Sequence, residues 1–297
     1  MKLSILYRGP LSSCDYACGY CPFAKTRNTA AELADDAARL RRFVGWTAQR
    51  SEHSVGILFT PWGEALIRRH YRDALTELSW MPHVRRVAVQ TNLSARLGWL
   101  GKANPEKLAL WCTYHPSQVK MADFVAQCSE LARRGFRYSV GIVGLKENFD
   151  AMQELRQLLP ADTYLWVNAY KRVADYYSPS DVTKIEAIDP LFGLNNQYHR
   201  SLGEECAAGE TAFSLDGDGN MYRCHFIKRK IGNIYEGDNG MERALKPRLC
   251  ENTVCGCHIG YVHMKRTGAE KIFGEGILER IPVRSPKELL QASSLVD

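Results

Sequence analysis

The sequence predicts an α/β protein with a parallel central sheet, and two observations support this. Short apolar runs with the composition of buried strands alternate with longer amphipathic segments over about the first 170 residues. Hydrophobic residues make up 45% of the chain and charged residues 24%, which is typical of a globular protein with a full-sized core. Strands that alternate with helices indicate parallel β-α-β units. Six such units fit a barrel and an open doubly wound sheet equally well.

Each expected element is recognised by its hydrophobic period. Apolar runs of strand length occupy residues 3–7, 55–59, 86–90, 108–113, 137–143 and 163–169. Between them, apolar residues recur at three- and four-residue intervals, which predicts helices over residues 30–49, 68–78, 122–134 and 148–158. Gly135 stands where a glycine is expected just after a helix.

The alternation fades after about residue 170, which indicates a second and smaller unit. Residues 176–180, Tyr-Tyr-Ser-Pro-Ser, predict a loop or linker. We therefore expect a core domain over residues 1–190 and a smaller domain over residues 191–297 that ends in a helical tail. In the second part, two short runs separated by Asp-Gly-Asp-Gly predict a hairpin between Cys206 and Cys224.

The composition argues against several classes of function. No apolar stretch approaches the roughly 18 residues that a membrane span needs, so we expect no membrane partner and a cytoplasmic location. The formal net charge is +6, and the sequence has neither the basic stripe nor the motif of a nucleic-acid-binding protein. We expect no nucleic-acid partner. In a reducing cytoplasm, the ten cysteines indicate metal or redox chemistry rather than disulfides.

A first cysteine cluster directly follows the first expected strand, in the order Cys14-Asp-Tyr-Ala-Cys18-Gly-Tyr-Cys21. Active sites of α/β domains collect at such strand ends. Three thiolates on one short loop can hold three irons of a cubane cluster and leave the fourth iron open to an exogenous ligand. A zinc loop is the alternative, although structural zinc sites usually have four ligands and paired Cys-x-x-Cys units.

The spacing of these cysteines, with the aromatic Tyr20 just before the last of them, resembles the signature of the radical S-adenosylmethionine (SAM) superfamily. The resemblance implies that Cys14, Cys18 and Cys21 hold a [4Fe–4S] cluster whose open iron is chelated by the methionyl amino and carboxylate groups of SAM. One electron then cleaves SAM, and a 5′-deoxyadenosyl radical abstracts hydrogen from a substrate. The resemblance also implies that Tyr20 contacts the cofactor and that an electron donor such as flavodoxin or ferredoxin is a partner.

Two further strand ends carry motifs of the same superfamily. Gly63 and Glu64 follow the second expected strand and resemble the glycine–glutamate motif, in which backbone and carboxylate meet the ammonium of SAM. Thr91 and Asn92 close the third expected strand and resemble the Thr-Asn turn that hydrogen-bonds around the cofactor or substrate. An ordinary turn at Thr91 and Asn92 is the simpler alternative.

The fifth and sixth expected strands add two weaker signals. The segment that begins at Ile142 resembles the I-x-G-x-x-E element that supports the adenine, and Asn168 stands where a polar residue contacts the adenosyl group. Taken together, the resemblance covers about residues 1–170 and implies a partial (β/α)6 barrel of the TIM type. Its side opening would admit a large substrate.

Five more cysteines follow residue 200. A hairpin returns its ends to one place, so Cys206 and Cys224 become neighbours, and Cys250, Cys255 and Cys257 are enough to complete a four-thiolate site. A four-cysteine zinc site is the alternative. The pattern around the hairpin is similar to the opening of the superfamily's SPASM and twitch extensions. It implies a small twitch-like domain with one auxiliary [4Fe–4S] cluster and one spare cysteine among the last three.

The expected function is that of a radical SAM oxidoreductase, and the resemblance favours a ribosomally made peptide as its substrate because such extensions occur in peptide-modifying relatives. Only 13 residues precede Cys14, which leaves no room for a separate leader-recognition domain, and twitch-like extensions also occur in relatives that oxidise sugars and aminocyclitols. A small-molecule dehydrogenase is therefore the alternative.

Two questions remain open at this stage. A spare thiol among Cys250, Cys255, Cys257 and the strand residue Cys112 would return a hydrogen atom to the substrate and make the net reaction an epimerisation, although core packing is the simpler role for Cys112. A two-cluster electron carrier is the alternative of another class. Such a carrier prefers four protein ligands on every cluster, and the three-cysteine loop argues against it.

Overall fold

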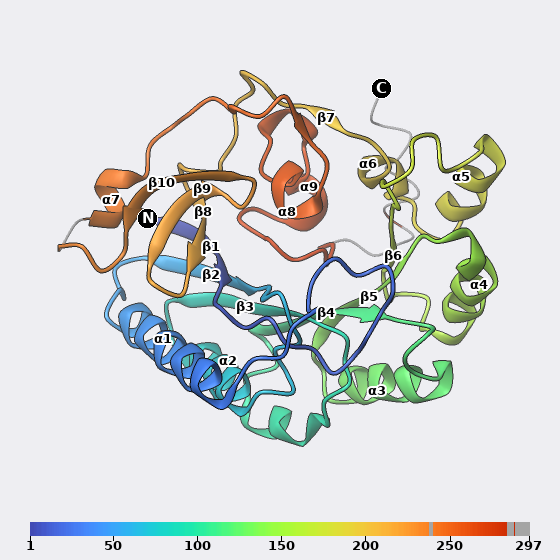
Figure 1. The fold of residues 1–297 in the computed structure, drawn as a ribbon, viewed down its shortest axis with the longest axis horizontal. Helices are drawn as coiled ribbons and strands as arrows, with labels where there is room; N and C mark the ends of the chain where they lie inside the picture. Colours follow the sequence, from blue (N-terminus) through green and yellow to red (C-terminus); the bar gives the residue numbers. More distant parts are fainter. Residues whose placement is uncertain (238–239, 284–287, 289–297) are drawn as a thin grey trace.

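The computed structural model describes residues 1–237, 240–283 and 288. Its centre is a nine-stranded sheet in the order β10-β9-β8-β1-β2-β3-β4-β5-β6 (Figure 1). Strands β1 to β6 pair in parallel, each with the next along the chain. A doubly wound sheet reverses its strand order in the middle, whereas this sheet does not. The sheet ends at β6 and β10 in the described residues, so it is an open sheet consistent with a partial TIM-type barrel.

The predicted strands and helices of the first 170 residues lie within two residues of the observed ones. The strands are β1 Lys2–Arg8, β2 Ser54–Phe59, β3 Val84–Thr91, β4 Leu108–Tyr114, β5 Arg137–Val143 and β6 Leu165–Asn168. The helices are α1 Ala30–Ala48, α2 Arg69–Trp80, α3 Met121–Arg133 and α4 Phe149–Leu158, with short 3₁₀ helices η1 Leu97–Lys102 and η2 Lys146–Asn148. The α/β fold class predicted from the sequence is confirmed.

Side chains of the sheet alternate between two apolar cores, as the period of a strand requires. In β1, Ile5 and Tyr7 pack against the helices, whereas Leu6 belongs to a second core on the opposite face. The helices end where the sequence predicts: Gly135 has a φ of +73° just after α3, a conformation that favours glycine.

The predicted hairpin is present and extends the same sheet. Strands β8 Ala212–Asp216 and β9 Asn220–Cys224 are antiparallel, and β10 Ile227–Asn233 follows them. Strand β8 pairs in parallel with β1, so one sheet runs across the boundary that we expected near residue 190. The division into two domains therefore stays a prediction.

The C-terminal segment fills the inner face of the sheet. It contains α8 His258–Tyr261, η3 Lys265–Thr267 and α9 Glu270–Phe273, which lie on the side of the sheet opposite α1 and α2 in Figure 1. Ile259, Phe273, Leu278 and Ile281 share a buried core there with inward-facing strand residues such as Trp166. The helical tail expected at the end of the chain falls on residues 284–287 and 289–297, outside the described residues.

The segment 176–180, expected as a loop or linker, is a loop up to Ser178 and enters a helix at Pro179. Ser178 caps α5 Pro179–Glu186 by accepting a hydrogen bond from the backbone of Asp181, and Pro179 occupies the first turn. This is a capping box with proline at its favoured position, so the expected loop ends at Ser178, two residues earlier than predicted. A four-residue helix α6, Phe192–Asn195, follows.

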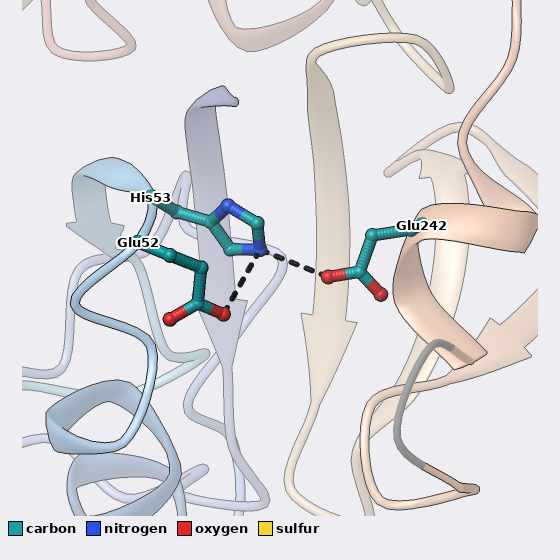
Figure 2. Close-up of side chains that lie close together, drawn as sticks. All are labelled: Glu52, His53 and Glu242. Carbon is teal, nitrogen blue, oxygen red and sulfur yellow. Dashed lines mark hydrogen bonds and ion pairs between the residues drawn. The ribbon is translucent and has the colours of Figure 1, made fainter.

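A hydrogen-bonded cluster of Glu52, His53 and Glu242 joins the start of β2 to the C-terminal part of the chain (Figure 2). His53 Nδ1 lies 3.1 Å from the amino group of Met1, and its Nε2 lies 2.9 Å from Glu242 of α7 Gly240–Ala244. Glu52 adds a second carboxylate at 3.5 Å. In this arrangement His53 accepts from the terminal ammonium and donates to Glu242, which fastens α7 beside the start of β2.

Two short strands, β7 His199–Arg200 and β11 Val254–Cys255, form a separate antiparallel pair. Over the described residues, none of the helices has the length and apolar character needed to cross a membrane.

Candidate active site

A cavity of about 670 Å³ opens at the carboxyl ends of the parallel strands. The loop after β1 supplies its largest share of lining residues, and the ends of β2 to β6 supply most of the rest. The C-terminal part adds His225, Phe226, Arg280 and the run from Cys257 to Ile259. Parallel strands bring their carboxyl ends to one edge, so residues distant in sequence meet in this cavity.

The cysteines of the first loop, Cys14, Cys18 and Cys21, all line the cavity. The backbone N–H of Tyr16 donates to Cys14 Sγ at 3.4 Å, and His115 Nδ1 lies 3.4 Å from Cys18 Sγ. Burial raises the pKa of the Cys14 thiol to about 12. A metal that binds these thiols must therefore displace their protons.

The loop after β1 is held against the loop after β2. The side chain of Asn28 accepts hydrogen bonds from the backbone of Ser12 and Ser13, each at 2.9 Å, and Glu64 N–H donates to Ser13 O at 3.1 Å. A Cβ atom at Gly63 would lie 2.0 Å from Ser13 O. Only glycine permits this approach, which explains why the glycine of the predicted motif stands at this position.

Glu64 is the centre of a buried network that joins the ends of β2 and β3. Its carboxylate accepts hydrogen bonds from Leu66 N–H at 2.9 Å, from the Thr91 hydroxyl at 2.8 Å and from Asn92 N–H at 2.7 Å. The Asn92 side chain donates to Asp15 at 3.0 Å, on the cysteine loop. Burial raises the pKa of Glu64 to about 7 despite these hydrogen bonds.

The remaining predicted cofactor residues divide into two groups. Tyr20 and Asn168 line the cavity, and the Tyr20 hydroxyl lies 2.6 Å from His115 Nδ1. Ile142 does not join them, because its side chain is buried in the core between sheet and helices, while its neighbour Val143 lines the cavity. Cys112 also lies in that core, with its thiol completely buried.

Four of the five C-terminal cysteines lie near one another, whereas the fifth, Cys257, lines the cavity. Cys206 packs with Cys224 and Cys255 in one small cluster. Burial, together with the neighbouring thiols of Cys206 and Cys250, raises the pKa of Cys224 to about 11. Cys257 lies near Cys255 but lines the cavity, where its side chain is exposed.

These thiols are not packed like the ligands of a single ion. Within the described residues, three or more metal-ligating atoms lie within 4.8 Å of one another at Glu52, His53 and Glu242. No three of the C-terminal thiols lie that close together in this part of the chain. A tetrahedral zinc site with bonds of about 2.3 Å brings its sulfurs to within about 4 Å of one another.

Several cavity residues were missed by the sequence reasoning. Arg8, the last residue of β1, donates to His225 Nε2 at 2.7 Å and to the Thr60 hydroxyl at 2.9 Å, and its guanidinium lies over the Trp62 ring at 4.2 Å. Its position at a strand end beside the cysteine loop was a usable signal. Arg280 had none, because the C-terminal segment brings it to the cavity from far along the chain.

Comparison of the chain with known proteins identifies structures that share its fold. No protein-family model and no curated protein matches the sequence. Among solved structures, native anSMEcpe with bound AdoMet and a Cp18Cys peptide is 17% identical, with a TM-score of 0.53 over 82% of this chain and 80% of that chain. A hexahistidine-tagged form of anSMEcpe with bound AdoMet is 15% identical, with a TM-score of 0.55 over the same shares. A complex of BtrN with AdoMet and 2-DOIA reaches only 0.45. The chain therefore shares the fold of anSMEcpe.

Proposed function

We propose that this chain is a radical SAM enzyme in which Cys14, Cys18 and Cys21 hold a [4Fe–4S] cluster that leaves one iron for SAM. One observation carries the proposal: the three thiols, the Glu64 network and Asn168 line a single cavity at the strand ends of this fold. The surroundings of Cys14 fit a cluster ligand, because the backbone N–H of Tyr16 and the side-chain amide of Asn92 both donate hydrogen bonds to Cys14 Sγ. When bound, the cluster and SAM together supply a 5′-deoxyadenosyl radical that abstracts hydrogen from the substrate.

The residues of the chain itself bind and orient the cofactor. Glu64 offers a carboxylate for the ammonium of SAM, and Thr91 and Asn92 hold that carboxylate in place. The Tyr20 hydroxyl is fixed by His115 at one wall, and Asn168 offers an amide at another. The protein's contribution is thus position and partial exclusion of water, while the cofactor supplies the reactive chemistry.

We further propose an auxiliary [4Fe–4S] cluster on Cys206, Cys224, Cys250 and Cys255. Three of these cysteines pack together, and Cys250 is near enough to affect the pKa of Cys224. Their wider separation favours a cluster over a single zinc ion. Cys257 is then the spare thiol, since it lines the cavity that Cys14 also lines.

We propose a ribosomally made peptide as the substrate. The support is that a protein of this fold, anSMEcpe, has AdoMet and a peptide bound together. The cavity of about 670 Å³ has room for part of a chain beside the cofactor. A small-molecule dehydrogenase remains the alternative, and an electron donor such as flavodoxin or ferredoxin is required in either case.

The decisive experiment is anaerobic reconstitution followed by addition of SAM and a strong reductant. We expect about eight irons per chain, from two four-iron clusters, and formation of 5′-deoxyadenosine. Candidate precursor peptides in deuterated water then report the outcome, since deuterium at an α-carbon indicates epimerisation and loss of two hydrogens indicates oxidation or cross-linking. An iron-replete protein that forms no 5′-deoxyadenosine refutes the proposal and favours an electron carrier.

The raised pKa of Glu64 predicts a pH dependence of SAM binding. Because burial raises that pKa to about 7, the carboxyl is mostly neutral at pH 6 and ionised at pH 8. An ammonium prefers the ionised form, so the affinity should rise by about tenfold per pH unit up to pH 7 and level off above it.

The variant Glu64→Gln should bind SAM about 10- to 100-fold more weakly at pH 8, because it loses a hydrogen bond to a charged group. The variant should also lose the pH dependence of SAM binding. Equilibrium binding to the cluster-loaded protein measures both effects, with Glu77→Gln, an exposed residue of α2 that does not line the cavity, as the control. Normal SAM binding by Glu64→Gln would show that the cofactor pocket is placed wrongly.

A further inference from the structure

The charged residues that line the cavity are unevenly distributed. Two are acidic, Asp15 and Glu64, and both belong to the network beside Cys14. Six are basic: Arg8, Lys25, Arg27, Lys171, Arg172 and Arg280. SAM is itself a cation, so its binding does not neutralise this excess of positive charge.

Three of the basic residues gather around one thiol. Cys257 lines the cavity together with Lys171, Arg8 and Arg280, and Lys171 donates to the backbone carbonyl of Gly256, the residue before Cys257. We call this group, Arg8, Lys171 and Arg280 with Cys257, the basic end of the cavity. Trp62 forms part of the same wall, under the guanidinium of Arg8.

Two of the three cations have no acidic partner among the ion pairs of the described residues. Arg8 bonds only to neutral groups, His225 and Thr60. Lys171 donates to the backbone carbonyls of Asn195, Gln197 and Gly256, which fix its ammonium in place without neutralising it. Burial lowers the pKa of Lys171 to about 8 and that of Arg8 to about 10, as expected for cations that lack a counter-ion.

Arg280 differs because it has a buried partner. Its Nη2 lies 3.2 Å from Asp189, which also accepts hydrogen bonds from Tyr164 and from the backbone of Val167. This pair holds Arg280 in place in the wall, over the Trp166 ring. The uncompensated charge of the basic end therefore comes from Arg8 and Lys171.

We infer that the basic end binds a carboxylate of the substrate, and that the modified peptide carries an acidic side chain near the reacting residue. This inference rests on the proposed function. Cations removed from water are normally paired, so a cavity that holds two partly buried cations without acidic partners is complementary to an anionic ligand. A carboxylate bound there would lie beside the thiol of Cys257.

The test uses binding rather than turnover, so it stays informative even if SAM cleavage fails. Cluster-loaded protein with SAM is treated with iodoacetamide under anaerobic conditions, and alkylation of Cys257 is followed by peptide mass mapping. The probes are N-acetyl-Gly-Glu-Gly-amide, its glutamine analogue, succinate and inorganic phosphate. A thermal shift on the same samples gives a second readout that does not depend on Cys257.

We expect the glutamate peptide to slow alkylation by about fivefold at four times its Kd, and to raise the melting temperature. The glutamine analogue and phosphate should do neither. Arg8→Gln should lose the protection, Arg8→Lys should keep part of it, and Arg69→Gln, on the exposed side of α2, should behave as the unchanged protein. Succinate as effective as the peptide would assign the site to a small acid.

Three results of the protection assay would overturn the inference, and a fourth comes from the iron content. The three are equal protection by the glutamine analogue, protection that survives in a folded Arg8→Gln variant, and protection by phosphate alone. If Arg8→Gln instead loses iron while the glutamate peptide still binds, Arg8 compensates the charge of the auxiliary cluster and the carboxylate site is refuted. Absence of 5′-deoxyadenosine in the unchanged protein would bear on the proposed function alone.

Discussion

Replacing Cys14, Cys18 and Cys21 together by alanine should lower the iron content from about eight to about four per chain and abolish 5′-deoxyadenosine formation. The three thiols all line the cavity, whereas the four proposed auxiliary ligands do not. Removing the first set therefore leaves the second cluster intact and takes away the binding site for SAM. Iron analysis and electron paramagnetic resonance of the reduced protein measure the first effect, and chromatography of the products measures the second.

Cys112→Ala is the matched control for this variant. Cys112 lies in β4, one of the parallel strands whose ends form the cavity. Its thiol, however, is buried between sheet and helices and does not line the cavity. The control should keep about eight irons and normal SAM cleavage. Stoichiometric zinc in place of iron in the unchanged protein, or unchanged iron in the triple variant, would contradict the assignment.

The elements of the first 170 residues could be predicted because their signals are local. Apolar period separates strands from helices, and Gly135 marks a helix end by a conformation that other residues avoid. Ser178 and Pro179 were equally clear helix-start signals, yet the neighbouring tyrosines and serines suggested a loop. The rule that functional residues follow strands also placed Glu64, Asn92 and Asn168 in one cavity.

The parts that could not be predicted depend on long-range contacts. The pairing of β8 with β1 joins residues about 200 positions apart, and no periodicity in either strand specifies its partner. The ion pair between Arg280 and Asp189 spans 91 positions and brings a charge into the cavity from the C-terminal segment. Ile142 shows that the sequence also does not decide which of two neighbouring strand residues faces the cavity. A one-residue difference in a strand changes the face that a side chain joins, and Val143 is the residue that lines the cavity.

The choice among the last three cysteines is also a consequence of packing. Cys255 and Cys257 are separated by a single glycine, Gly256, and in sequence they are equivalent candidates for a cluster. In the structure, Cys255 pairs through β11 with β7 and packs against Cys206, while Cys257 lines the cavity with Arg8 and Lys171. This divergence supports the proposal that four of the five C-terminal cysteines are cluster ligands and that Cys257 is the spare thiol.

Single substitutions should separate the two cysteines. Cys255→Ser should lower the iron content from about eight to about four, because a four-thiolate site loses one of its ligands, whereas Cys257→Ser should keep about eight. Cys250→Ser should behave like Cys255→Ser, which tests the fourth ligand by the same iron assay. Each variant should still form 5′-deoxyadenosine without peptide, since the first cysteine loop is intact. If Cys257→Ser loses as much iron as Cys255→Ser, Cys257 is a cluster ligand, and the cations around it serve the cluster rather than the substrate.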